Sequence, residues 1–184
     1  VTGVQTCALP ISTAYVPPAS GAVPLPTGGF GAFRPGQAGS LTPGQMASFQ
    51  PGQIAQLPPT AVGAFNAGQM GALPPDAFAG FRPNQIAALP PTALGGLSGQ
   101  QIAALPPTAM SAFKPTQFAA LPPAAMSGFQ PTQVGALPPD ALRAMKPDQF
   151  SAMPPMAFAG FKPAQIDVMP PSRSEEHTSE LQSR

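Results

Sequence analysis

Residues 73–88 read LPPDAFAGFRPNQIAA, and the same 16-residue pattern recurs along most of the chain. Each unit begins with Leu-Pro-Pro, or with Met-Pro-Pro in the last two units. The first residues of the units are Leu57, Leu73, Leu89, Leu105, Leu121, Leu137, Met153 and Met169. A unit of this length cannot bury an apolar face alone, so its stability must come from stacking against neighbouring units. The spacing therefore predicts a repeat protein.

Each 16-residue unit consists of two related octads, and the octad register extends back to Phe33. Position 1 of the octad is a large apolar residue, position 3 is Pro in all but two octads, and position 6 is apolar again. Position 5 alternates between Gln and Ala from Gln53 onward. We call the two kinds Gln octads and Ala octads; the Ala octads carry the Leu-Pro-Pro or Met-Pro-Pro sequence.

The octad has the residues that a helix start requires. Proline has a fixed φ and no N–H, so it is well suited to the first helical position. Position 5 is then the third helical residue, where a Gln side chain can accept the N–H of the N-cap residue, and positions 1 and 6 can pack on each other as a hydrophobic staple. The next Pro, eight residues later, disfavours helical geometry in the residue before it. We therefore expect one capped helical turn per octad.

Stacking of these turns predicts a mostly α fold, a slim repeat solenoid with two octads in each 16-residue coil. Positions 1 and 6 of both octads would fill its core, and each buried side chain would contribute about 1.5–3 kcal/mol. The alternative is a disordered or polyproline-like low-complexity chain, since 29 Pro and 19 Gly make up about a quarter of the 184 residues. That alternative gives no reason for the strict Gln and Ala alternation.

The two ends of the chain differ from the octads. Residues 1–11 and 173–184 resemble the conceptual translation of a sequencing-library adapter, read from opposite strands. We therefore interpret both segments as adapter artefacts and exclude them from the fold. Residues 12–32 are rich in Pro and Gly and are predicted to be a linker, and residues 33–172 form the octad array.

Little in the sequence points to catalysis. The only Cys and the only His, Cys7 and His177, fall in the adapter-like ends, so a triad of His177 with Ser111 and Asp140 has no support. We predict no catalytic, cofactor-binding or metal-binding residue. Residues 12–172 carry six basic and four acidic side chains without a basic cluster, which disfavours nucleic acid and anionic membranes as partners. No apolar run is long enough to span a bilayer.

Two rows of side chains would line up if the coils stack. The first row is a possible surface ladder of Gln53, Gln69, Gln85, Gln101, Gln117, Gln133, Gln149 and Gln165. Capping or Gln-to-Gln hydrogen bonding is the interpretation that we favour for this row, and a ligand-binding stripe is the alternative. The second row is a sparse basic edge of Arg82, Lys114, Lys146 and Lys162, which we interpret as a solvated edge that keeps the rod soluble.

The octad Leu/Phe-x-Pro-x-Gln-Ile/Val-x-x, from Phe33 to Pro171, resembles the octads in long repetitive regions of large bacterial secreted and surface proteins. Some of those regions accompany calcium-binding or adhesin-like domains. The resemblance implies a secreted or cell-surface location. We therefore expect a non-enzymatic structural or spacer segment of a larger protein; the alternative is a repeat binding module that presents a surface to a protein or glycan partner.

Overall fold

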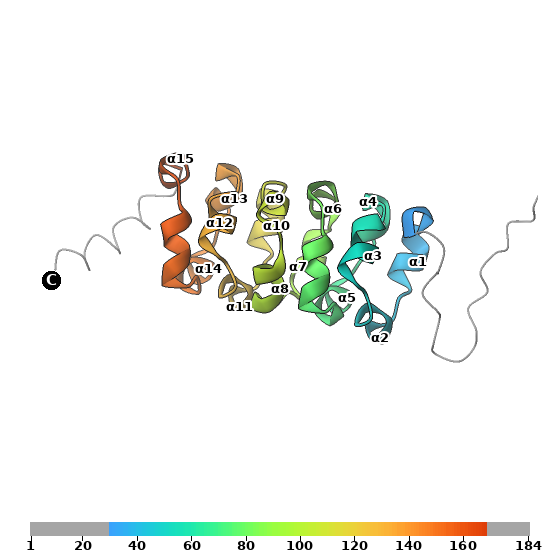
Figure 1. Ribbon diagram of the computed structural model, residues 1–184. Helices are drawn as coiled ribbons and strands as arrows, with labels where there is room; N and C mark the ends of the chain where they lie inside the picture. Colours follow the sequence, from blue (N-terminus) through green and yellow to red (C-terminus); the bar gives the residue numbers. More distant parts are fainter. Residues whose placement is uncertain (1–29, 169–184) are drawn as a thin grey trace, which may run out of the picture.

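The computed structural model describes residues 30–168 of the chain. Short helices follow one another along these residues, which contain no β-strand, and they lie side by side in one row from α1 to α15 (Figure 1). The mostly α, slim repeat solenoid predicted from the octads is confirmed. Both adapter-like segments, together with residues 12–29 and 169–172, lie outside the described residues.

The helices are each three to six residues long. They are η1 (Phe30–Ala32), α1 (Pro35–Gly39), α2 (Pro43–Met46), α3 (Pro51–Gln56), α4 (Pro59–Val62), α5 (Ala67–Ala72), η2 (Pro75–Gly80), α6 (Pro83–Ala88), α7 (Pro91–Leu94), α8 (Gly99–Ala104), α9 (Pro107–Met110), α10 (Pro115–Ala119), α11 (Pro123–Met126), α12 (Pro131–Val134), α13 (Pro139–Arg143), α14 (Pro147–Ser151), η3 (Pro155–Gly160) and α15 (Pro163–Ile166). The η elements are 3₁₀ helices. From α1 onward every helix begins at position 3 of an octad, so the predicted helical turn per octad is confirmed.

Extended backbone at positions 1 and 2 separates one helix from the next. Leu57, which follows α3, has φ −62° and ψ 135°, and Pro58, which precedes α4, has φ −67° and ψ 145°. The steric demand of Pro58 disfavours the helical region at Leu57 and so ends α3 there. Each Ala octad thus begins with two extended residues, and these form the corners of the solenoid.

Positions 1 and 6 fill one continuous core. Every position 6 residue from Met46 to Leu142 is at most 1% exposed, and every position 1 residue from Phe49 to Met153 is at most 4% exposed. Position 5 of the Ala octads, such as Ala61 and Ala93, is fully buried as well. The core therefore uses the positions that the octad pattern predicted and adds the small alanine to them.

The coil of the solenoid is larger than the 16 residues expected. Each helix packs against the helices three octads before and after it: α3 contacts η2, η2 contacts α8, and α10 contacts α13. A coil of two octads is therefore wrong, because two short segments cannot surround the inward-facing side chains at positions 1 and 6, whereas about three segments can. Since the sequence alternates in twos and the packing steps by threes, a Gln octad stacks on an Ala octad throughout.

The backbones of stacked octads touch at some glycines. A Cβ atom at Gly80, the last residue of η2, would overlap the carbonyl oxygen of Pro51, the first residue of α3, and Gly160 meets Pro131 in the same way. Both glycines end a 3₁₀ helix of sequence Pro-x-Ala-Phe-Ala-Gly. The absence of a side chain at these positions allows the coils to approach to backbone contact.

The array begins earlier than predicted. Residues 30–32, assigned to the linker from their composition, form η1, which packs against α3. Phe30 is buried, and its ring lies 5.8 Å from that of Phe49, centroid to centroid. Phe30 falls at position 6 of the octad register, so its burial extends the array although position 3 of its octad is Thr27 and not Pro.

Candidate functional site

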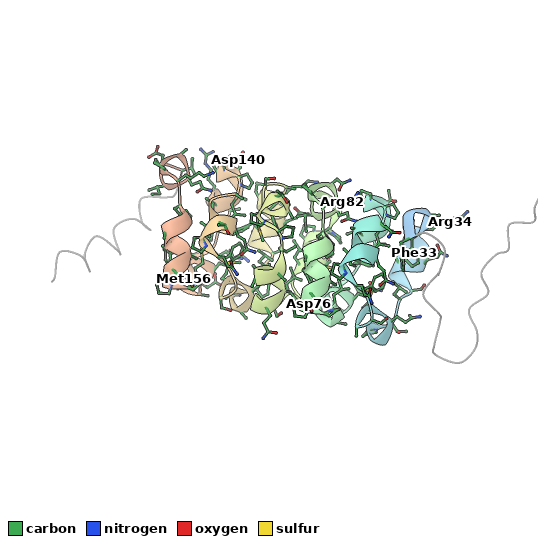
Figure 2. All side chains as sticks on the ribbon, viewed as in Figure 1. Phe33, Arg34, Asp76, Arg82, Asp140 and Met156 are labelled. Atoms are coloured by element: carbon green, nitrogen blue, oxygen red, sulfur yellow. The ribbon has the colours of Figure 1, made fainter. Side chains whose placement is uncertain are left out.

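The row of glutamines at position 5 is the most regular polar feature of the described chain. Each glutamine is the third residue of its helix, and the seven from Gln69 to Gln165 are at most 3% exposed. Gln53, the first of the row, is half-buried. The expected surface position is therefore wrong for these seven: the ladder runs inside the solenoid. Charged side chains such as Arg34, Asp76 and Asp140 lie on the outside (Figure 2).

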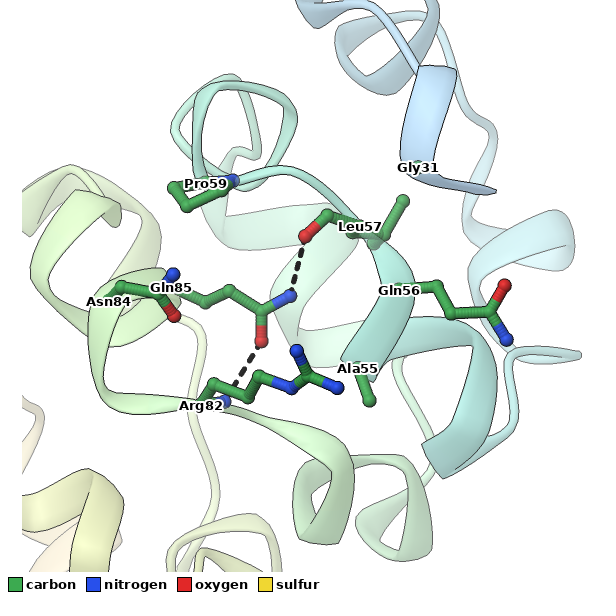
Figure 3. Close-up of a pocket in the computed structure, with 8 residues that line it drawn as sticks. All are labelled: Gly31, Ala55, Gln56, Leu57, Pro59, Arg82, Asn84 and Gln85. Atoms are coloured by element: carbon green, nitrogen blue, oxygen red, sulfur yellow. Dashed lines mark hydrogen bonds between the residues drawn. The ribbon is translucent and has the colours of Figure 1, made fainter. Parts of the chain in front are cut away.

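Gln85 shows how one rung of the ladder is built (Figure 3). Its Oε1 accepts the backbone N–H of Arg82, the N-cap of α6, at 2.9 Å. Its Nε2 donates to the carbonyl oxygens of Ile54 and Leu57, both at 2.7 Å. The side chain therefore joins the N-terminus of one helix to the C-terminus of another helix about one coil earlier.

The same three bonds recur in every rung from Gln69 to Gln165. Nε2 always donates to the carbonyls 31 and 28 residues earlier, at 2.7–3.0 Å. The N–H groups at the start of a helix and the C=O groups at its end have no partner within the helix. Each rung supplies partners for both, and no buried side-chain polar atom of the described residues lacks a hydrogen-bond partner.

Only glutamine can make this set of bonds at this reach. Its amide offers one acceptor and two donors, whereas glutamate has no donor when ionised and asparagine is one methylene shorter. The predicted capping bond to the N-cap N–H is present. The donor bonds run to backbone carbonyls and not to other glutamines, and the sequence carried no signal for them because their partners are 28 and 31 residues away.

Three N-cap residues add a reciprocal bond. The side chains of Thr42, Asn66 and Ser98 accept the backbone N–H of the glutamine three residues later, which completes a capping box in α2, α5 and α8. Elsewhere the N-cap of a Gln octad is Arg, Lys or Gln, and the bond from the glutamine serves instead. The glutamine is therefore the constant member of the cap.

The charged groups lie at the surface. Arg82, Lys114, Lys146 and Lys162 of the basic edge are all exposed. Arg143 and Asp140 form an ion pair at 3.5 Å with side chains 60% and 75% exposed, and such a surface pair contributes less than about 1 kcal/mol. Ser111 donates its hydroxyl to the Thr108 carbonyl of its own helix at 2.8 Å. Cys7 and His177 lie outside the described residues, within which no group of three potential metal ligands occurs.

A groove lies beside the Gln85 rung (Figure 3). It encloses about 310 Å³ and is lined by Gly31, Ala55, Gln56, Leu57, Pro59, Arg82, Asn84 and Gln85. The Arg82 side chain extends across the groove toward Ala55. The groove therefore combines one cation with two amides, and this combination suits oxygen-rich groups such as carboxylates or sugar hydroxyls.

Comparisons with known protein families, with curated proteins and with solved structures found no match to this chain. Within residues 30–168 no helix has the length and apolar character needed to cross a bilayer.

Proposed function

We propose that the chain is a non-enzymatic structural spacer, a segment of a larger bacterial secreted or cell-surface protein that holds neighbouring parts at a set distance. The observation that carries this proposal is the uniform ladder: every rung from Gln69 to Gln165 ties its helix to backbone carbonyls about one coil earlier. Because each coil repeats the same contacts, length increases by an equal step per unit. The location rests on the resemblance of the octad to those of secreted and surface proteins.

The treatment of the aromatic residues supports the spacer. All twelve phenylalanines of the chain lie in the described part, and each is buried or half-buried. A binding module that recognises peptides or glycans commonly presents aromatic side chains at its surface. Here the aromatic groups stabilise the core instead.

Deletion of whole 16-residue units tests the spacer. Spin labels on cysteines at Gly44 and Ala164, both exposed, in a Cys7→Ser background report the distance between the two ends by pulsed electron paramagnetic resonance. Deleting residues 89–104 should shorten this distance by one step, and deleting residues 89–120 should shorten it by twice that step. Both deletions preserve the octad register and the Gln and Ala alternation. Shortening that does not scale with the number of units removed would contradict the proposal.

A binding module remains the second candidate, and the groove beside Arg82 favours it. A carboxylate or hydroxyl-rich glycan could bind between Arg82 and Asn84. Titration of the full chain with neutral and acidic oligosaccharides, followed by calorimetry, tests this role. Binding that is lost in Arg82→Ala and retained in Arg34→Ala, a matched change at the same octad position, would support it.

A further inference from the structure

Apolar side chains lose their cover toward the C-terminal end of the described solenoid. Position 6 is at most 1% exposed from Met46 to Leu142, yet Ile166 in α15 occupies the same position and is 53% exposed. Phe158 and Phe161, at positions 6 and 1, are half-buried. Position 6 therefore depends on the following coil for its burial. We call the surface formed by Phe158, Phe161 and Ile166 the tail face.

The N-terminal end lacks the opposite partner. Gln37 is exposed and Leu41 is half-buried, although the equivalent residues further along are buried. Gln37 Oε1 accepts the Arg34 N–H at 2.9 Å, so its amide is held as in the buried rungs. Within residues 30–168 no coil precedes Gln37, and its Nε2 has no carbonyl partner there. We call the surface formed by Gln37 and Leu41 the head face.

The two faces complement each other. Inside the solenoid, a glutamine of one coil donates to a position 6 carbonyl of an earlier coil, while later octads cover the position 6 side chain. The head face offers such a glutamine, and the tail face offers an uncovered position 6 residue, Ile166. Stacking one face on the other would therefore continue the interface that already joins successive coils.

We propose that the head face of one copy of this chain binds the tail face of a second copy. The contact is heterologous, because different surfaces meet, and its repetition produces open end-to-end chains of molecules. Stacking removes Ile166 from water and supplies the partners that Gln37 lacks within the described residues. This inference is independent of the spacer role, since a rod separates its neighbours whether or not its ends stack.

Sedimentation of the full chain over a range of concentrations tests the contact. The wild type should form larger species as its concentration rises. Ile166→Asp should weaken association at least about tenfold, since it places a charge in the apolar contact. Met156→Asp is the control: Met156 is 66% exposed, but it lies at position 4, where Thr60 and Thr92 are exposed within the solenoid as well. This control should associate like the wild type.

A head-face variant completes the test. Gln37→Glu keeps an acceptor for the Arg34 N–H and removes the donor, so it too should associate more weakly. Mixing Ile166→Asp with Gln37→Glu should restore dimers and nothing larger, because each variant keeps one intact face. A wild type that stays monomeric at all concentrations would overturn the proposal, as would an Ile166→Asp variant that associates normally. A mixture no heavier than its components would overturn it too, since that result indicates pairing of like faces. Circular dichroism of each variant confirms that it is folded.

Discussion

Gln101 Nε2 lies 2.9 Å from the carbonyl oxygen of Met70, a residue 31 positions earlier in the chain. The same nitrogen donates to the Leu73 carbonyl at 2.7 Å, while Oε1 accepts the Ser98 N–H at 2.9 Å. One uncharged side chain therefore connects the start of α8 with the end of α5. Several properties of the solenoid depend on this relationship.

Removing one rung should destabilise the solenoid. Gln101→Ala leaves two carbonyls and one N–H without their partner in a buried position, which we expect to lower the free energy of unfolding by about 2–4 kcal/mol. Gln100→Ala is the matched control, because Gln100 is the adjacent exposed residue of the same helix, and its effect should stay below about 0.5 kcal/mol. Urea unfolding of both variants measures the difference. Equal midpoints would show that the buried rung contributes nothing.

Replacing the same amide by a carboxyl group should make stability depend on pH. In Gln101→Glu the carboxylate would be buried and would face two carbonyl oxygens, so its pKa in the folded state is raised above that of the unfolded chain. The protonated acid retains one donor. Stability is therefore highest below the unfolded pKa and is lost as pH rises through the folded pKa. Melting curves should show a higher midpoint at pH 4 than at pH 7 for this variant relative to wild type, and a parallel response of the two proteins would contradict the expectation.

The close contact between coils should not tolerate a methyl group at Gly80. A Cβ there overlaps the Pro51 carbonyl, so Gly80→Ala must separate η2 from α3 and should cost about 1–3 kcal/mol. Gly52→Ala is the control within α3, because no atom lies within 4 Å of its Cβ position. That change should be neutral or stabilise by about 0.5–1 kcal/mol, since alanine favours the helix. Thermal unfolding of the two variants checks the opposite signs.

The alternation of octads should matter more than the length of the array. Deleting residues 89–96 removes one Ala octad and preserves the octad register, but the Gln octad of α8 then falls three octads after the Gln octad of α5. A buried glutamine would occupy the space of a fully buried alanine such as Ala77. We expect a lower melting temperature than for deletion of residues 89–104, although the latter removes twice as many residues. The reverse order would indicate that the alternation is unimportant.

The local features were predictable because their bonds span few residues. Proline at position 3 begins the helices, the glutamine of each Gln octad from Gln85 onward caps its own N-cap residue, and the staple positions 1 and 6 form the core. Each of these depends on residues within one octad. The alternation of Gln and Ala also showed that position 5 had a specific role.

Other features depended on distance in space. The glutamine ladder was predicted in sequence but placed at the surface, because a coil of 16 residues was assumed. Phe30 was assigned to a linker because Thr27 stands where proline begins most other octads. Gly80 carried no local signal, since its role depends on Pro51 in another coil.

Local chemistry thus specifies a capped turn every eight residues, through bonds between residues three and four positions apart. How many turns complete a coil is decided by the packing of positions 1 and 6 around a common core, which no single octad contains. That packing brings carbonyls 28 and 31 residues away within reach of each buried glutamine. The octad pattern therefore established the kind of unit, and the three-dimensional stacking established its partners and the position of the ladder inside the solenoid.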